Sequence, residues 1–207
     1  EAVFLVSSAL VALRVSEIHF NPAPPSEGEE ANDLDDADLF EFVELRNVGD
    51  SELSLEGVTF AEGIDFVFGN TALGAGERVL VVNDLAAFEQ RYGAGVLPVA
   101  GEYGGTLSNA GETLTLVGPF GEVIGSFTFD DAWYPPADGG GRSLVVADEL
   151  ADLSFWDVAE GWRASTFPGG SPGAGEEPLP PLRISEVHYH PRDPDEDEEA
   201  AGYDSEE

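Results

Sequence analysis

The stretch that decides the fold is residues 13–22, LRVSEIHFNP, which occurs again as LRISEVHYHP at residues 182–191. Six of the ten positions are identical, and each copy runs directly into an acidic tract. A spacing of 169 residues is far longer than the repeat unit of a solenoid, so it indicates tandem whole domains. We therefore expect one domain at residues 13–170 and the start of a second copy, cut off, at residues 182–207.

Two connecting segments flank the expected domain. Residues 171–181 (SPGAGEEPLPP) are rich in Gly and Pro and predict a linker. Residues 1–12 are mostly apolar but too few to cross a bilayer, and they predict a connecting or inter-unit β-strand. That strand would pair with the open sheet edge of a neighbouring unit through Val3, Phe4, Leu5 and Val6. Because the chain begins with Glu1 rather than Met, we expect a piece of a longer protein.

Short apolar segments separated by turn signals predict an all-β domain. The expected strands are residues 13–20, 39–47, 58–60, 64–68, 78–83, 113–117, 123–129 and 143–147. Only residues 84–93 have the pattern of a helix, with Asn83 or Asp84 as the N-cap and Gly93 as the stop. About eight such strands with one short helix favour a β-sandwich.

Several of these segments, in this order, resemble the lamin tail domain in the form found in bacterial secreted and surface proteins. The similar stretches are residues 14–22, 40–47, 73–82, 107–112, 138–144 and 162–165, the last followed by Gly170-Ser171-Pro172-Gly173. The resemblance covers most of residues 13–174 and implies an immunoglobulin-like β-sandwich. It also implies a non-catalytic module used for binding or architecture. The long acidic insertion after Pro22 departs from the compact pattern of that family.

Composition excludes several kinds of partner and chemistry. The chain has 42 Asp and Glu against 8 basic residues, none of them lysine, for a formal net charge of −34. Nucleic acids and anionic membranes are therefore poor partners, because both are bound through Lys and Arg clusters. The absence of cysteine excludes disulfides, thiolate chemistry and cysteine zinc sites.

The two acidic tracts are candidate calcium sites. Closely spaced carboxylates repel one another, and hard oxygen ligands at short spacing are what Ca²⁺ prefers. In the second tract, four aspartates stand at positions 1, 3, 5 and 12 of a calcium-loop pattern, although Glu198 replaces the glycine expected at position 6. The candidate ligands are Asp193, Asp195, Asp197 and Asp204 in the second tract, and Asp33, Asp35, Asp36 and Asp38 in the first. The alternative is a solvated acidic loop or an adaptation to salty surroundings.

Aromatic residues and histidines leave a second function open. Trp133 and Tyr134, with Trp156 and Trp162, could stack on a glycan or cap the core, and the core interpretation is favoured. The three histidines have no spacing typical of a metal or catalytic site, and no nucleophile elbow or phosphate loop is present.

The sequence thus predicts a structural module of an extracellular or cell-surface tandem-repeat fibre or stalk. Its partners would be neighbouring repeats or copies of itself, with Ca²⁺ at the acidic junctions. The alternative is a glycan- or protein-binding accessory module of a larger secreted enzyme. No constellation of residues predicts an activity for this chain itself.

Overall fold

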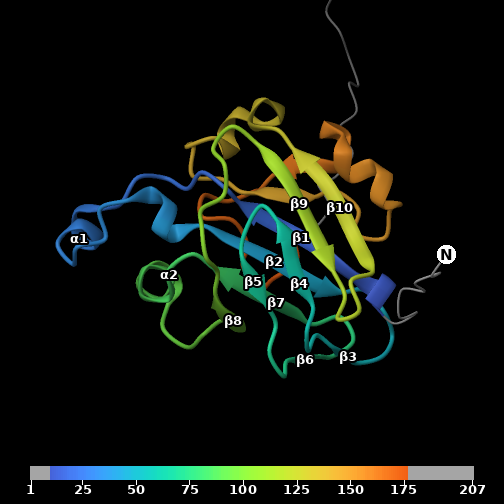
Figure 1. Ribbon diagram of the computed structural model, residues 1–207. Coiled ribbons are helices and arrows are strands. Elements are labelled where there is room, and N and C mark those ends of the chain that lie inside the picture. The colour runs from blue at the N-terminus through green and yellow to red at the C-terminus, as the bar shows by residue number, and fades with distance from the viewer. Residues whose placement is uncertain (1–9, 177–207) are drawn as a thin grey trace, which may run out of the picture. The chain divides into compact units, whose positions relative to one another are not determined.

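The structure, a computed structural model, describes residues 10–176 (Figure 1). The chain divides into residues 1–176 and residues 177–207, and only the first unit contains described residues. Strands dominate this unit, and its only α-helices among the described residues are α1 (Glu27–Glu30) and α2 (Leu85–Tyr92). The predicted β-rich class is confirmed.

The main sheet has six strands in the order β12-β11-β1-β2-β7-β8. Their bounds are β1 (Leu13–His19), β2 (Phe42–Asn47), β7 (Arg78–Val82), β8 (Val99–Glu102), β11 (Leu144–Val146) and β12 (Trp162–Ala164). All neighbours are antiparallel except β7 and β8, which are parallel. The opening strand β1 therefore lies in the interior of the sheet, with a neighbour on each side.

A second sheet of four strands lies in front of the first in Figure 1, in the order β10-β9-β4-β5. It consists of β4 (Thr59–Glu62), β5 (Phe66–Val67), β9 (Glu112–Val117) and β10 (Val123–Phe129), and a separate pair joins β3 (Leu53–Ser54) to β6 (Ala72–Leu73). Alternate side chains of both larger sheets enter one hydrophobic core, as expected for sheets with one buried face. Phe127 packs there against Trp156 and Trp162, which confirms the predicted core position of these two tryptophans.

The opposite face of the six-stranded sheet is divided between apolar and polar side chains. Helix α2 covers the apolar part, where Phe88 packs on Phe42, Leu80 and Val82. The helix begins as predicted, because Asp84 accepts a hydrogen bond from the Ala87 amide at 2.8 Å, and it ends at Gly93. The polar part carries Glu17, Glu44 and Arg78 and is covered by another segment of the chain.

Short 3-10 helices occupy several connections. They are η1 (Leu10–Ala12), η2 (Ala37–Phe40), η3 (Asp131–Trp133), η4 (Pro135–Ala137), η5 (Leu153–Asp157) and η6 (Ala159–Gly161). The first one corrects the expectation of a strand through residue 12, since residues 10–12 form a turn of helix. The second moves the start of the predicted strand 39–47 to Phe42.

The first acidic tract is more ordered than the sequence suggested, because it contains helix α1. The expectation of a single helix in the domain was therefore wrong. Ser26 and Glu29 form a capping box at the start of α1. Glu29 is buried and bonded to Arg91 of α2, with Nε and Oε1 2.8 Å apart. The Arg91 guanidinium also stacks on the Phe40 ring at 3.4 Å from its centroid. Arg91 thus holds the first acidic tract against helix α2 through its contacts with Glu29 and Phe40.

Strands β3, β6, β8 and β12 were not expected from the sequence. Strands β3 and β6 have two residues each, and β8 contains Gly101, so their side-chain patterns carry little signal. Strand β12, with the sequence WRA, is three residues long and sits at the edge of the sheet. Long-range pairing rather than local propensity forms these strands.

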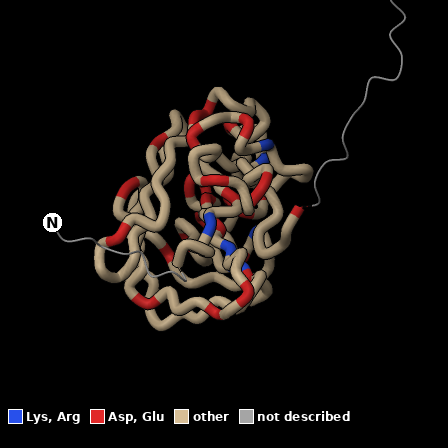
Figure 2. The backbone as a smooth tube through the Cα atoms, turned by 90° about the vertical axis from the view of Figure 1, so that its right-hand side faces the viewer, with Lys and Arg blue, Asp and Glu red and all other residues tan. Residues whose placement is uncertain are grey.

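Acidic residues recur along the whole described chain, whereas arginines are few (Figure 2). Every arginine of residues 10–176 has a bonded partner in the described part of the chain. The arginines paired with carboxylates are Arg46, Arg78, Arg91 and Arg163, while Arg14 and Arg142 donate to backbone carbonyls. The arginines of residues 10–176 therefore form contacts within the fold, and most of the other charged side chains are acidic. Within residues 10–176 there is no helix of the length and apolarity that crossing a membrane requires.

Candidate functional site: a carboxylate pair that holds the exit segment

Two buried glutamates face each other across the centre of the six-stranded sheet. Glu17 of β1 and Glu44 of β2 are directly opposite in the register, and both are at most 1% exposed. Like charges directly opposite in a sheet are destabilising, and a buried carboxylate is costly unless donors surround it. The donors around this pair therefore determine whether the arrangement is stable.

A β-bulge brings a third polar residue to the pair. The register shifts between Val15 and Glu17, so Ser16 is the extra residue on β1. Its hydroxyl donates to Oε1 of Glu44 at 2.6 Å. The bulge thus lets two successive residues of the recurring motif, Ser16 and Glu17, take part in the same polar cluster.

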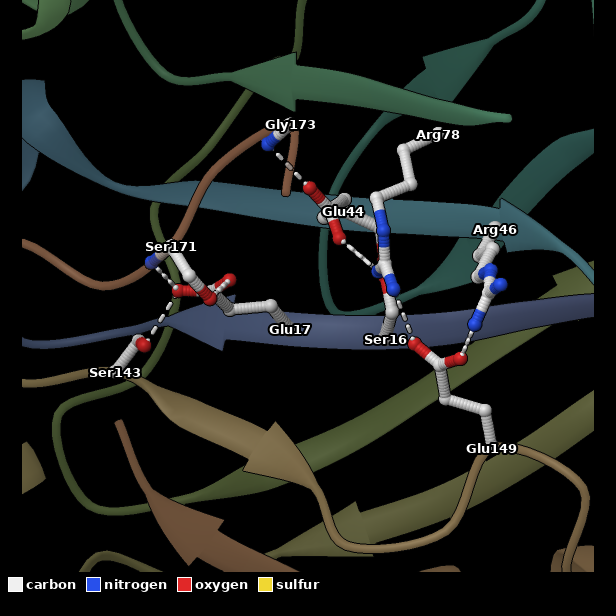
Figure 3. Close-up of polar contacts among 9 residues, drawn as sticks. All are labelled: Ser16, Glu17, Glu44, Arg46, Arg78, Ser143, Glu149, Ser171 and Gly173. Atoms are coloured by element: carbon white, nitrogen blue, oxygen red, sulfur yellow. Dashed lines mark hydrogen bonds and ion pairs between the residues drawn. The ribbon is translucent and has the colours of Figure 1, made fainter. Parts of the chain in front are cut away.

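The segment that leads out of the domain supplies the next donors (Figure 3). We call residues 170–176 the exit segment. The Ser171 amide donates to Oε1 of Glu17 at 2.8 Å, and the Ser171 hydroxyl donates to Oε2 at 2.7 Å. The Gly173 amide donates to Oε2 of Glu44 at 2.6 Å. Two backbone amides of one segment, two residues apart, are therefore bound by the two opposed carboxylates.

Charge compensation is unequal within the pair. Arg78 donates to Oε1 of Glu44 at 2.6 Å and to Glu149 at 2.7 Å, and Arg46 also pairs with Glu149 (Figure 3). Around Glu17 the donors within residues 10–176 are neutral: besides Ser171, the Ser143 hydroxyl donates to Oε1 at 2.5 Å. Glu44 is therefore a member of an ion pair, whereas no cation of residues 10–176 is bonded to Glu17.

This difference affects the titration of Glu17. Burial, together with the nearby Glu44, raises the pKa of Glu17 to about 7, against the opposing effect of its bonds from Ser143 and Ser171. Burial also raises the pKa of Glu44, although the charge of Arg78 acts in the opposite direction. The pair therefore contains a carboxyl group, that of Glu17, whose pKa lies near neutral pH.

The glycines of the exit segment permit this close approach. Gly170 has φ +78°, and a Cβ there would overlap Oε1 of Glu17 and lie 2.9 Å from the Ser143 hydroxyl. At Gly173, also with φ +78°, a Cβ would lie 2.7 Å from the Leu97 side chain. The residues 171–176, expected to be part of a linker, are thus bound to the six-stranded sheet, and Glu176 pairs with Arg163.

Replacing Gly170 by alanine is expected to release the exit segment. The matched control is Gly76→Ala, because Gly76 has nearly the same φ, +77°, but nothing within 4 Å of the added Cβ. Both variants incur the backbone strain, so a loss of protection at the Ser171 and Gly173 amides only in Gly170→Ala isolates the contact with Glu17. Amide hydrogen exchange measures it. Equal protection in both variants would contradict the proposed role of this contact.

Another fully buried glutamate, Glu41, lies outside this site. Glu41 is 0% exposed and accepts from the Tyr103 hydroxyl and the Leu107 amide, each at 2.9 Å and each through Oε2. Its Oε1 accepts no hydrogen bond from residues 10–176. Burial raises the pKa of Glu41 to about 8. This carboxyl group therefore remains largely protonated at neutral pH and fastens the loop after β8 to the start of β2.

His19 is a buried neutral residue. It stacks edge-on against Phe42, with the ring centroids 5.3 Å apart, and its Nδ1 is 3.4 Å from the Tyr92 hydroxyl. Burial, with the charge of Arg91, lowers the pKa of His19 to about 3. The Tyr92 hydroxyl donates to the Gly169 carbonyl at 2.9 Å, so His19 and Tyr92 adjoin the start of the exit segment.

The first set of predicted calcium ligands is not brought together. Asp36 caps η2 by accepting from the Asp38 amide at 3.1 Å, and Asp33 adopts φ +63° after α1. Nowhere in residues 10–176 do three or more His, Cys, Asp or Glu side chains converge in a way that could hold a metal ion. The second set, Asp193, Asp195, Asp197 and Asp204, lies outside the described residues, as does the predicted inter-unit strand Val3, Phe4, Leu5 and Val6.

The predicted glycan-binding rings lie at the margin of the core. Trp133 and Tyr134 are both half-buried and pack against it. The Tyr134 hydroxyl lies 2.9 Å from the Ala159 carbonyl oxygen and 2.8 Å from that of Trp162, and these two acceptors share its one proton. Tyr134 thus fastens η6 and β12, a role that does not depend on a ligand.

Sequence reasoning did not single out the carboxylate pair, although a signal for it was present. Ser16 and Glu17 recur as Ser185 and Glu186, whereas their neighbours Val15 and Ile18 exchange with other aliphatic residues. Four polar residues of β1, Arg14, Ser16, Glu17 and His19, are identical in the second occurrence of the motif, and Ser16 and Glu17 are the two that form the bonds described above. Comparison with known proteins adds no assignment: no protein-family model matches this chain, and no curated protein matches it either.

Proposed function

We propose that this chain is a non-catalytic structural unit of an extracellular or cell-surface protein, built of tandem domains that form a fibre or stalk. The observation that carries this proposal is the contact between the recurring motif and the exit segment. Ser16 and Glu17 belong to the stretch that opens each copy, and Glu17 binds the segment that leaves the domain. Because the opening motif binds the exit segment of the same domain, it fixes the position from which the connection to the next domain begins.

The contact also supports a mechanical role. The opening strand β1 lies between β11 and β2, and the exit segment is bonded to β1 and β2 through Glu17 and Glu44. Tension applied through the two ends of the unit would then act on elements that are joined directly to each other. A spacer in a fibre requires such a short path for load.

We further propose that the fold is an immunoglobulin-like β-sandwich of the lamin tail kind. Two sheets that share one core, with alternating buried and outward side chains, support this assignment. Calcium at the acidic junctions remains part of the proposal, with Asp193, Asp195, Asp197 and Asp204 as ligands. Its support is the repulsion expected from a net charge of −34.

Mechanical unfolding of single molecules, pulled from both ends of the 207-residue chain, tests the structural role. We expect the domain and its exit segment to unfold together in one step, at a force that Glu17→Ala lowers. The control is Glu52→Ala, since Glu52 is exposed and its side chain makes no hydrogen bond within residues 10–176. If the exit segment detaches at low force before the domain unfolds, and Glu17→Ala changes nothing, the proposal is wrong.

The calcium part has its own test. Light scattering in calcium, then with excess chelator at constant ionic strength, measures the molar mass of the native chain. A larger assembly that dissociates on chelation is expected. A monomer in both conditions would remove calcium-dependent assembly and leave the mechanical test unaffected.

The second candidate function is a glycan- or protein-binding accessory module. It is favoured by Trp133, which is only half-buried, whereas Trp156 and Trp162 are 2% and 1% exposed. Binding to a glycan array that Trp133→Ala abolishes, without a change in stability, would favour this candidate over the structural one.

A further inference from the structure

The carboxylate pair and the exit segment also form a device that can respond to pH, an inference that rests on the proposed function. The exit segment is the cover that buries Glu17. Its Ser171 residue bonds both carboxylate oxygens, and Gly170 approaches so closely that no side chain would fit there. Detaching this segment would therefore give water access to the Glu17 carboxylate.

The charged and titratable groups around Glu17 come from several elements. Glu44 lies opposite on β2, Arg78 of β7 is bonded to Glu44, and Glu149 is bonded to Arg78. His19 lies on β1 itself, and Tyr92 faces the pair from α2.

Glu17 is the member of this group whose pKa lies near neutral pH. Burial lowers the pKa of His19 and raises that of Tyr92, so both stay neutral. Arg78 is bonded to both Glu44 and Glu149, and its charge opposes the rise that burial gives to the pKa of Glu44. Among the described residues, the donors bonded to Glu17 are all neutral.

We infer that the exit segment is a pH-responsive latch, which stays closed on the carboxylate pair while Glu17 is protonated and loosens when Glu17 is ionised. Protonation removes the repulsion between two carboxylates that lie directly opposite in the sheet. The neutral carboxyl group can still accept from the Ser171 amide and can donate its proton to a serine hydroxyl. Ionisation restores the repulsion and favours the open form, in which water solvates Glu17.

The direction of the effect follows from linkage. In the closed latch the pKa of Glu17 is about 7, whereas exposure in the open latch would return it toward its ordinary value near 4.5. The open form thus binds fewer protons, and raising the pH between these two values favours opening. Between pH 5 and pH 8 the latch opening constant is expected to rise by a factor of roughly 50–100.

Amide hydrogen exchange of the 207-residue chain tests this inference. The protection factors of the Ser171 and Gly173 amides, corrected for intrinsic exchange, are expected to fall by that factor between pH 5 and pH 8. Amides of β2 and β7 report opening of the whole domain and should fall less. Glu17→Gln should make protection at residues 171 and 173 independent of pH, because a neutral amide of the same shape replaces the carboxyl group. The control Glu52→Gln should behave as the wild type.

The outcomes separate the latch from the proposed function. Strong protection that does not change with pH would overturn the pH response but would leave the structural role of the exit segment intact. An absence of protection at every pH would overturn both. An unchanged pH response in Glu17→Gln would also overturn the inference. If that variant fails to fold, the test is the pH dependence of the chemical shift of the Glu17 side-chain carboxyl carbon in the wild type. A titration midpoint below pH 5 would overturn the inference.

Discussion

Replacing Arg78 by methionine lowers the free energy of unfolding by about 3–5 kcal/mol, the range for breaking a buried ion pair from one side. The Glu44 side chain is 0% exposed and that of Arg78 is 10% exposed, so water cannot replace the lost partner. Glu44 would keep only the Ser16 hydroxyl and the Gly173 amide as donors, opposite a second carboxyl group on Glu17. Urea denaturation at neutral pH measures the effect.

Arg46→Met is the matched control, because Arg46 binds the same Glu149 carboxylate but is more exposed, at 34% of its side chain. Its loss leaves Glu149 bonded to Arg78, so we expect a cost within about 1 kcal/mol. In the double variant Arg78→Met with Glu44→Gln, part of the stability should return, since no uncompensated charge remains. If the two single variants lose equal amounts of unfolding free energy, the burial of the Arg78–Glu44 ion pair does not account for the effect of Arg78.

The elements that sequence reasoning located correctly are those with strong local signals. Strand β10 was predicted with its observed bounds, and β1 and β7 within one residue, because runs of apolar and β-branched residues define them. Helix α2 was located by its capping aspartate and terminal glycine. These signals depend only on neighbouring residues.

What the sequence could not locate depends on contacts between distant residues. The glycines and Pro172 of the exit segment are typical of a linker, yet Gly170 and Gly173 are required for close packing on the sheet. The carboxylates that bind this segment lie 154 and 129 residues away from Ser171 and Gly173. Similarly, the acidic residue Glu29 is buried because of Arg91, 62 residues further along the chain. From composition alone, charged residues such as Glu29 are expected to be exposed. Whether they are buried depends on the partners that they find elsewhere in the chain.

The second large effect concerns Glu41 and the pH dependence of stability. The folded protein is expected to lose about 2 kcal/mol of stability between about pH 6.5 and about pH 8.5 through this residue. The pKa of Glu41 is raised to about 8 by burial, whereas its ordinary value is 4.5. The folded state thus keeps a proton that the unfolded state has already lost, so stability falls as the pH rises between these two values. Glu17, with a pKa of about 7, adds a smaller loss of the same sign.

Comparing the slopes of the wild type and the variants above pH 6.5 isolates this effect, because each glutamine variant removes one titrating carboxyl group and leaves the others in place. The pKa of His19 is lowered to about 3, so its contribution is complete above its ordinary value of 6.5 and is lost only as the pH falls. Glu41→Gln should flatten the curve of unfolding free energy against pH, and adding Glu17→Gln should flatten it further, while Glu52→Gln should leave the slope unchanged. The glutamine amide changes the free energy of unfolding by the same amount at every pH. The test is therefore the slope of unfolding free energy against pH, not its absolute value. A wild-type curve that is already flat over this range would show that Glu41 is ionised in the folded protein, and that its raised pKa is wrong.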